Sequence, residues 1–223
     1  MNDDIREAVL SLKRERIMTA AVDTFYEQGF GNSTLDQVAE RMGMTKPFIY
    51  AHFHSKNELL AAICAQGISV SLQAINRALA SGGSSHDRLT AFAHDFMLAV
   101  LASQKHIAIY TREEKNLGDA DRQTIKNMRR EFDHKLTGLL DQGVASGEFD
   151  MAETPLAALA IGGVASWASV WFRPGGRLPA QDIAKHMADL MLSMTRVNSG
   201  VGKSAQTPPE RLPRQNRTKE TTP

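Results

Sequence analysis

Residues 34–58 read TLDQVAERMGMTKPFIYAHFHSKNE, and their spacing predicts two short helices joined by a tight turn. Thr34 and Gln37 have the spacing of a capping box at the start of the first helix. Gly43 follows the last apolar residue of that helix and readily adopts the left-handed backbone conformation that ends helices. Thr45 is expected to cap the second helix. A helix, a glycine turn and a second helix predict a helix-turn-helix, whose second helix is built to lie in the DNA major groove.

Helical patterns continue on both sides of this motif. Ser55 and Glu58 form a second capping box, and apolar residues recur at helical spacing through most of the chain. The further predicted helices cover residues 3–29, 56–80, 84–101, 105–117, 119–146, 154–172 and 180–197. No segment alternates apolar and polar residues as a half-buried strand does, so the expected fold class is all-α.

The 223 residues are expected to divide into two folded parts and a tail. We predict a three-helix helix-turn-helix domain at residues 1–55, joined to a larger helical ligand-binding and dimerisation domain at residues 56–197. Residues 198–223 are rich in Gly, Ser, Thr, Pro, Lys and Arg and have no apolar period, which predicts a disordered tail.

Residues 17–60 resemble the DNA-binding domain of TetR-type transcriptional repressors. The matching features are the Thr34 cap, the spacing from Ala39 to Gly43, the pairs Thr45-Lys46 and Ile49-Tyr50, Phe53, and the pair Ser55-Lys56. Phe48 departs from the family pattern, because a small or polar residue is usual at that position. This departure affects which bases would be contacted and leaves the expected docking mode unchanged.

The candidate DNA contacts lie at helix starts or on the second helix of the motif. They are Thr34, Thr45, Lys46, Pro47, Phe48, Tyr50, His52 and Lys56. Lys46 is expected to donate to guanine O6 and N7, and Phe48 to lie against a thymine methyl. Tyr50, His52 and Lys56 are expected to contact phosphates, although Tyr50 is alternatively a packing residue and His52 a solvated one. One such motif is small, so we expect a two-fold homodimer on a palindromic double-stranded DNA operator.

Charge alone does not predict a nucleic-acid partner, because the formal net charge of the chain is only +1. Residues 1–60 hold seven Lys or Arg against nine Asp or Glu, a net charge of −2. The balance reverses locally, because residues 41–57 hold three basic side chains, two histidines and no acidic side chain. This local surface is the one that a phosphate backbone would meet.

Residues 154–172 contain no charged side chain, although Thr154 and Pro155 are a strong helix-start signal. The length of this segment meets the threshold for a membrane span. We favour the alternative, a helix buried on one side by its own subunit and on the other by a partner, and expect no membrane association. No basic-then-apolar leader is present, and the single cysteine, Cys64, cannot form an intrachain disulfide, so we expect a cytoplasmic protein.

The second half of the chain resembles one branch of the same family. The resemblance covers residues 110–113 and 166–178. It implies that the last two helices form a four-helix bundle in the dimer, and that the effector is an acyl-CoA thioester or a related lipid or aromatic acid derivative. The candidate pocket residues are Phe92, Phe96, Tyr110, Glu113, Trp167 and Trp171. Each aromatic residue is alternatively a core residue, and Trp167 and Trp171 alternatively belong to the dimer interface.

Catalysis is not expected. The histidines lack metal-ligand spacing, no glycine-rich phosphate loop or nucleophile elbow is present, and the adjacent Glu113 and Glu114 diverge around a helix. We therefore predict no cofactor and no metal. The alternative to an effector-responsive regulator is a DNA-binding or architectural protein that needs no ligand. The large second domain argues against that alternative, and a cavity among the middle helices would separate the two.

Overall fold

The computed structural model describes residues 2–195, and within that range the chain contains helices and no strand. The helices are α1 (Asn2–Gln28), α2 (Leu35–Arg41), α3 (Lys46–Tyr50), α4 (Lys56–Ala80), α5 (Ser85–Ala102), α6 (Gln104–Glu113), the 3-10 turn η1 (Glu114–Asn116), α7 (Asp119–Ala145), α8 (Thr154–Trp171) and α9 (Ala180–Ser193). The all-α prediction is confirmed. The predicted tail at residues 198–223 and the end of the predicted helix at 180–197 lie outside the described residues.

The residues that begin the two helices of the helix-turn-helix, and the glycine between these helices, largely have the predicted conformations. The Thr34 hydroxyl accepts from the Gln37 amide at 3.2 Å, and the Thr34 amide donates to the Gln37 side chain at 2.8 Å. Gly43 has a φ of +65°, the left-handed conformation that its position requires. Thr45 occupies the predicted N-cap position of α3 with an extended backbone, but its side chain makes no capping hydrogen bond. Pro47 in the first turn of α3 fixes a helical φ and promotes the start of that helix.

Two hydrophobic cores organise the molecule. The first lies in the part formed by α1–α3 and the start of α4, hereafter the reader, and includes the fully buried Phe25, Ile49 and Phe53. The second fills the body, formed by the rest of α4 and by α5–α9. Ile109 of α6 and Ile125 of α7 belong to the reader core. The predicted boundary at residue 55 is therefore crossed by continuous packing.

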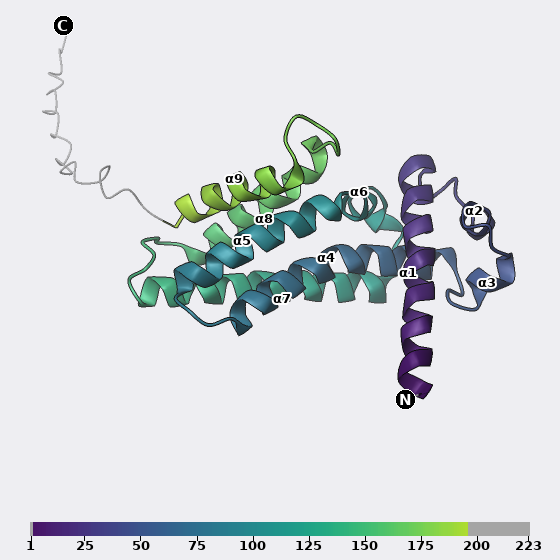
Figure 1. The fold of residues 1–223 in the computed structure, drawn as a ribbon, viewed down its shortest axis with the longest axis horizontal. Coiled ribbons are helices and arrows are strands. Elements are labelled where there is room, and N and C mark those ends of the chain that lie inside the picture. Colours follow the sequence, from purple (N-terminus) through teal and green to yellow (C-terminus); the bar gives the residue numbers. More distant parts are fainter. Residues whose placement is uncertain (1, 196–223) are drawn as a thin grey trace, which may run out of the picture.

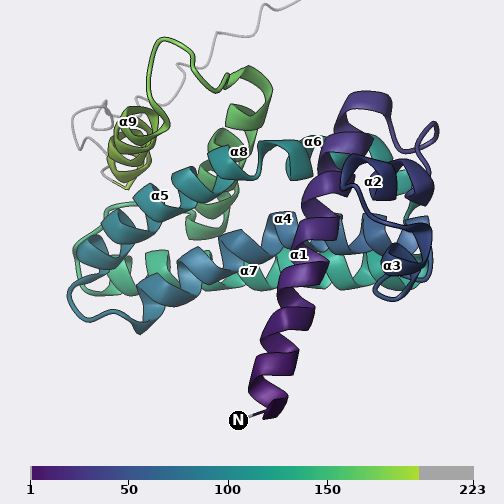
Figure 2. The ribbon, with the colours of Figure 1, turned by 45° about the vertical axis from the view of Figure 1, so that its right-hand side comes forward.

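The helices of the body other than α6 lie roughly along one direction, α6 lies across them, and the reader lies at one end of the body (Figure 1). α4 packs against α5 and α7, and α5 packs in turn against α9. α1 crosses the end of this bundle, and its N-terminal half projects away from the rest of the chain (Figure 2). α6 packs against α1, α4 and α8, so it connects the reader to the body.

Two helices, α4 and α8, are long and apolar enough to cross a membrane by length and composition alone. Buried core helices pass the same test, and α4 buries Leu60, Ile63 and Ile75 within the two cores. α8 buries a row of small residues and one isoleucine against the body, namely Ala158, Ile161, Ala165 and Ala168. Its other side is exposed in the single chain.

Candidate nucleic-acid interface and internal cavity

The exposed side of the helix-turn-helix is formed by the start of α3. Thr45, Lys46 and Pro47 are exposed, Tyr50 is 41% exposed, and Ile49 points into the reader core. The Lys46 ammonium lies 2.9 Å from an Asp36 carboxylate oxygen, and this hydrogen bond raises the pKa of Lys46. Both side chains of this ion pair are 57% exposed, so the pair contributes little to stability and can be exchanged for another acceptor.

Phe48 and His52 lie one turn apart and contact each other. Their ring centroids are 5.4 Å apart in an edge-to-face arrangement, and Phe48 is half-buried against the reader core. Only part of the Phe48 ring is therefore available to a thymine methyl. Desolvation lowers the pKa of His52, and Lys13 and Arg14 lower it further. A neutral His52 can donate one hydrogen bond to a phosphate, but it brings no positive charge.

Lys56 and Thr34 are held by the protein itself. The Lys56 ammonium donates to the carbonyl oxygens of Phe30 at 2.7 Å and Ser33 at 2.8 Å, and it lies 4.3 Å from the centroid of the Phe30 ring. The Thr34 hydroxyl is used by its own capping box. These contacts argue against the predicted phosphate contact of Lys56 and limit Thr34 to contacts through backbone amides. The contacts of both residues stabilise the reader itself.

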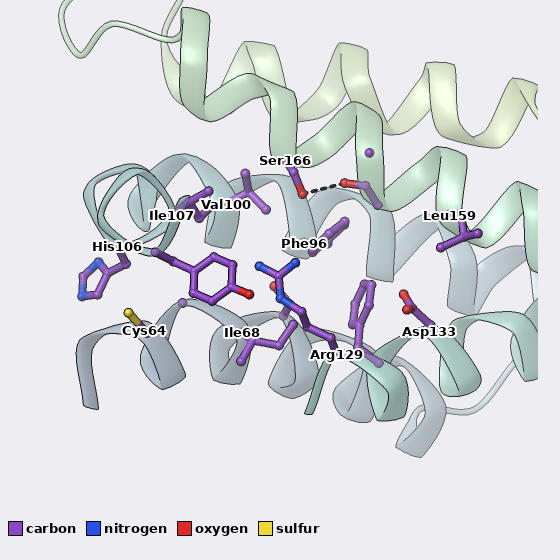
Figure 3. Close-up of a pocket in the computed structure, with 16 residues that line it drawn as sticks. Cys64, Ile68, Phe96, Val100, His106, Ile107, Arg129, Asp133, Leu159 and Ser166 are labelled. Carbon is purple, nitrogen blue, oxygen red and sulfur yellow. Dashed lines mark hydrogen bonds between the residues drawn. The ribbon is translucent and has the colours of Figure 1, made fainter. Parts of the chain in front are cut away.

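An internal cavity of about 290 Å³ lies among α4, α5, α6, α7 and α8. It is lined by Cys64, Gly67, Ile68, Ser71, Phe96, Val100, His106, Ile107, Tyr110, Arg129, Phe132, Asp133, Leu159, Gly162, Gly163 and Ser166. Figure 3 shows Arg129 extending into the cavity below Ser166, with Leu159 and Asp133 at the end away from His106 and Cys64. The predicted Phe96 and Tyr110 line it, so a partly open cavity does exist among the middle helices.

Four predicted pocket residues do not line this cavity. Phe92 is fully buried behind Phe96, with ring centroids 5.0 Å apart. Glu113 accepts from the Phe30 amide at 3.5 Å and from the Asn116 side chain at 2.8 Å, so its carboxylate faces the reader. Trp167 and Trp171 lie on the exposed side of α8, and Trp171 instead borders a 390 Å³ groove with Phe172 and residues of α9.

The polar groups of the cavity come mainly from residues that sequence reasoning missed. Arg129 and Asp133 lie one turn apart beside the apolar stripe of α7, and their i to i+4 spacing was the only available signal. The Arg129 guanidinium lies 4.3 Å from the Tyr110 ring centroid. Burial raises the pKa of Asp133 and of Tyr110, and it lowers the pKa of His106.

The lining of this cavity holds one basic and one acidic side chain, those of Arg129 and Asp133. Among the described residues, no carboxylate forms an ion pair with Arg129 within 4.0 Å. His106 Nδ1 is buried without a hydrogen-bond partner in the same part of the chain. Within residues 2–195, no cluster of three or more His, Cys, Asp or Glu is arranged to hold a metal ion. The site therefore suits an apolar molecule that carries an acidic or strongly polar group.

The exposed side of α8 is apolar along its whole length and is hereafter the α8 face. It consists of Leu156, Leu159, Ala160, Gly163, Ser166, Trp167, Val170 and Trp171. Trp167 is 65% exposed, although Trp is usually well buried. Leu190 of α9 and Met194, directly after the end of that helix, are also exposed. A contiguous apolar surface of this kind is typical of a protein–protein interface.

Comparisons with known proteins agree with both parts of the fold. A family model described as bacterial regulatory proteins, tetR family, matches residues 17–63. A model of the tetracyclin repressor-like C-terminal domain matches residues 82–195. The HTH-type transcriptional repressor KstR2 of Rhodococcus jostii is 28% identical over 182 residues, covering 81% of this chain and 89% of that protein.

Solved structures show the same architecture. The TetR family regulator PfmR from Thermus thermophilus is 26% identical, with a TM-score of 0.73 over 80% of this chain and 97% of its own. AibR, solved in complex with isovaleryl coenzyme A and operator DNA, is 24% identical, with a TM-score of 0.67 over 82% of this chain and 97% of its own. The AibR likeness bears on the fold alone.

Proposed function

Because this chain belongs to the TetR family and is a transcriptional repressor, we propose that it binds a palindromic operator as a homodimer and is released by a small hydrophobic acid or an acyl-CoA. Homologues of this chain are DNA-binding regulators and not enzymes. The exposed start of α3 offers Thr45, Lys46 and Tyr50 to a major groove. A helix of five residues reads few base pairs, so two readers are needed for useful specificity.

The position of α6 is the observation that supports control of DNA binding by an effector. This helix lines the internal cavity with His106, Ile107 and Tyr110. Lys105 and Arg112 of the same helix contact α1 of the reader. A molecule that moves α6 therefore also moves the reader. This arrangement favours an effector-responsive repressor over the alternative of a DNA-binding protein that needs no ligand.

Cavity size and charge support the class of effector. The 290 Å³ volume is at the small end of the range of about 300–1,000 Å³ for ligand pockets. It suits a short acyl or aromatic group, so the nucleotide part of a coenzyme A thioester would remain outside. Arg129 is placed to pair with a carboxylate, or to donate to a thioester carbonyl, while Phe96, Val100 and Phe132 contact the apolar part.

Release from DNA would be a population shift. The effector would favour the state of the dimer in which the spacing of the two readers no longer matches the operator. The size of this effect is limited to the difference between the affinities of the effector for the two states.

The test is a mobility-shift titration on an operator selected from a random DNA library. Free carboxylic acids of increasing chain length and isovaleryl coenzyme A would be added to the dimer–operator complex. We expect at least one series to release DNA. In the Arg129→Gln variant, the concentration of that effector needed for release should rise by about 10- to 100-fold, which is equivalent to the loss of one charged hydrogen bond. Operator affinity without effector should be unchanged in that variant. If neither series releases DNA, the ligand-independent alternative is favoured.

A further inference from the structure

A second hollow, hereafter the α1 groove, lies between α1, α4 and the start of α6 and has a volume of about 490 Å³. Its polar lining consists of Ser11, Arg14, Glu15 and Thr19 of α1, Gln66 of α4, and Ser103 directly before α6. The arginine and the glutamate balance in charge, and the hydroxyls and the amide supply both donors and acceptors. The α1 groove therefore suits an uncharged polar group such as a hydroxyl.

His106 is shared by the α1 groove and the internal cavity, because it lines both. On α4 the boundary between them falls between two adjacent residues, since Gln66 lines the groove and Gly67 lines the cavity. A Cβ added at Gly67 would lie 3.5 Å from the His106 Cβ, so α6 lies close to α4 here and the partition is the His106 side chain. Figure 3 shows the His106 ring at one end of the cavity, turned away from Arg129.

The His106 ring can be displaced at little cost. Its Nδ1 atom is buried without a hydrogen-bond partner, so rotation of the ring breaks no hydrogen bond at this atom and can provide one. Burial lowers the pKa of His106, which keeps the ring neutral at neutral pH. A chain that pushes the ring aside therefore leaves no charge behind in the apolar part of the cavity.

We propose that the α1 groove is a second subsite of the effector site, and that a long effector enters it by displacing the His106 ring. This inference rests on the acid effector of the proposed function. With the carboxyl group of the effector at Arg129, its chain would pass Val100 and Ile107, and its far end would lie in the groove. Because the groove is polar, the effector is a long-chain acid with a hydroxyl at the end remote from its carboxyl group.

An effector in the α1 groove would contact the reader directly. Arg14, which lines the groove, donates to the His52 carbonyl oxygen, and its guanidinium lies 4.1 Å from the centroid of the Phe53 ring. His52 and Phe53 follow the end of α3. The far end of a long effector would therefore lie beside the side chain that holds the end of the recognition helix.

Calorimetric titration of the full-length protein with two ligand series tests the subsite. One series consists of the unbranched carboxylic acids from butanoic to hexadecanoic acid, and the other of their ω-hydroxy counterparts. In a short acid the hydroxyl stays in the apolar part of the cavity and should weaken binding. Once the chain is long enough to pass His106, the hydroxyl should strengthen binding by about three- to tenfold, the equivalent of one hydrogen bond.

Three variants test the residues of the partition and the groove. His106→Ala removes the ring that a long chain must displace, so long acids should bind more tightly while short acids keep their wild-type affinity. Gln66→Leu removes the amide of an exposed groove residue and should reduce the gain from the hydroxyl. His134→Ala, at an exposed histidine of α7 that lines neither hollow, is the matched control and should change neither series. Circular dichroism verifies the folding of each variant.

The outcomes separate this inference from the proposed function. If the hydroxyl weakens binding at every chain length while short acids still bind and release DNA, the groove is no subsite and the effector-responsive repressor stands. If no acid of either series binds, the acid effector of the proposed function fails and the subsite fails with it. Equal affinities of His106→Ala and His134→Ala for long acids would overturn the role of His106. The two series are compared on the wild-type protein, so they decide the proposal even if His106→Ala does not fold.

Discussion

Lys46 and Lys56 lie ten residues apart in the reader and carry the same charge, but their surroundings give them different roles. The Lys46 ammonium faces solvent and contacts one exposed carboxylate, that of Asp36. The Lys56 ammonium is held by two carbonyl oxygens and one aromatic ring. Substitution of each by alanine therefore tests a separate property of the reader.

Lys46→Ala is expected to relax operator specificity at one base position. A lysine that donates to guanine contributes about 1–3 kcal/mol of discrimination against the wrong base. Binding of operators mutated one base pair at a time would measure this effect. Asp36→Asn is the matched control, because it removes the ion-pair partner and leaves Lys46 in place. A uniform loss of affinity for every operator would instead assign Lys46 to a phosphate.

Lys56→Ala is expected to destabilise the reader rather than to change its salt dependence. Loss of its contacts leaves the Ser33 carbonyl without this donor, at a cost of about 1–3 kcal/mol, while the Phe30 carbonyl still accepts from the Ser33 amide at 3.2 Å. Thermal unfolding should show this loss, while the dependence of operator affinity on salt should keep its slope. Lys46→Ala provides the comparison, since its exposed ion pair contributes little to stability. If the slope of operator affinity against salt concentration fell by about one, the predicted contact of Lys56 with a phosphate would be supported instead.

At this scale the sequence predicts residue types better than residue contacts. The capping box of Thr34 could be predicted because both partners lie within four residues. The contacts of Lys56 could not, because Ser33 and Phe30 are 23 and 26 residues away. Arg129 was missed for the same reason. Its side chain meets Tyr110 of another helix, and helical spacing does not show which flank of α7 faces a cavity.

At the scale of elements, the start of α5 is held by a carboxylate from elsewhere in the chain. Glu148 accepts from the Ser85 amide at 3.2 Å and the His86 amide at 2.8 Å, and from the Ser146 hydroxyl at 2.9 Å. These hydrogen bonds, those of His86 and Ser146 first, lower the pKa of Glu148 to about 2. The turn after α7 is thereby joined to the first turn of α5.

This cap predicts an acid-dependent loss of stability. A lowered carboxyl pKa contributes stability above its ordinary value of 4.5, and this contribution is lost as the pH falls toward about 2. Glu148→Gln should therefore lower the melting temperature at neutral pH and make its decline on acidification shallower than in the wild type. Thermal unfolding measured from neutral pH down to about pH 2 gives both effects. Parallel curves for the two proteins would show that Glu148 does not titrate with folding.

Helix boundaries were more predictable than helix faces. Local signals such as Gly43, the Ser55 cap and Pro155 mark the ends of helices, and the structure places helix ends beside them. Glu113 and Trp167 were assigned to the pocket because their residue types suit one, but they face the reader and solvent. Which side of a helix faces a cavity depends on the packing of all its neighbours, and no local pattern encodes it.

At the scale of the whole molecule, the reader and the body meet at α6. The Lys105 ammonium lies 2.5 Å from an Asp23 carboxylate oxygen of α1. The Arg112 guanidinium donates to the Tyr26 carbonyl oxygen at 3.4 Å and lies 5.0 Å from the centroid of the Tyr26 ring. Ile109, between these two residues on α6, is buried in the reader core. The cations therefore tie α1 to a helix whose other side lines the cavity.

The double variant Lys105→Met, Arg112→Met is expected to weaken the response to the effector while leaving the operator affinity of the free protein close to that of the wild type. Its lost ion pair contributes about 0.2–1 kcal/mol, and each lost cation–π contact at an exposed site about 0.5–1 kcal/mol. Their sum is similar to a typical allosteric coupling free energy of about 1–3 kcal/mol, so the ratio of operator affinities without and with effector should fall several-fold. Titrations of operator at zero and saturating effector give that ratio directly.

Arg41→Ala is the matched control for this experiment. Its ion pair with Glu27, at 2.8 Å, joins two residues of the reader and does not reach α6. If coupling between the cavity and the reader depends on the cations of α6, Arg41→Ala keeps the wild-type ratio of operator affinities without and with effector. Only the double variant then shows a smaller ratio. If both proteins keep the ratio, the connection must run through the buried contacts of Ile109 and α4. Those contacts cannot be broken without disturbing the reader core, so the charged contacts at the surface are the part of the junction that can be tested without unfolding the reader.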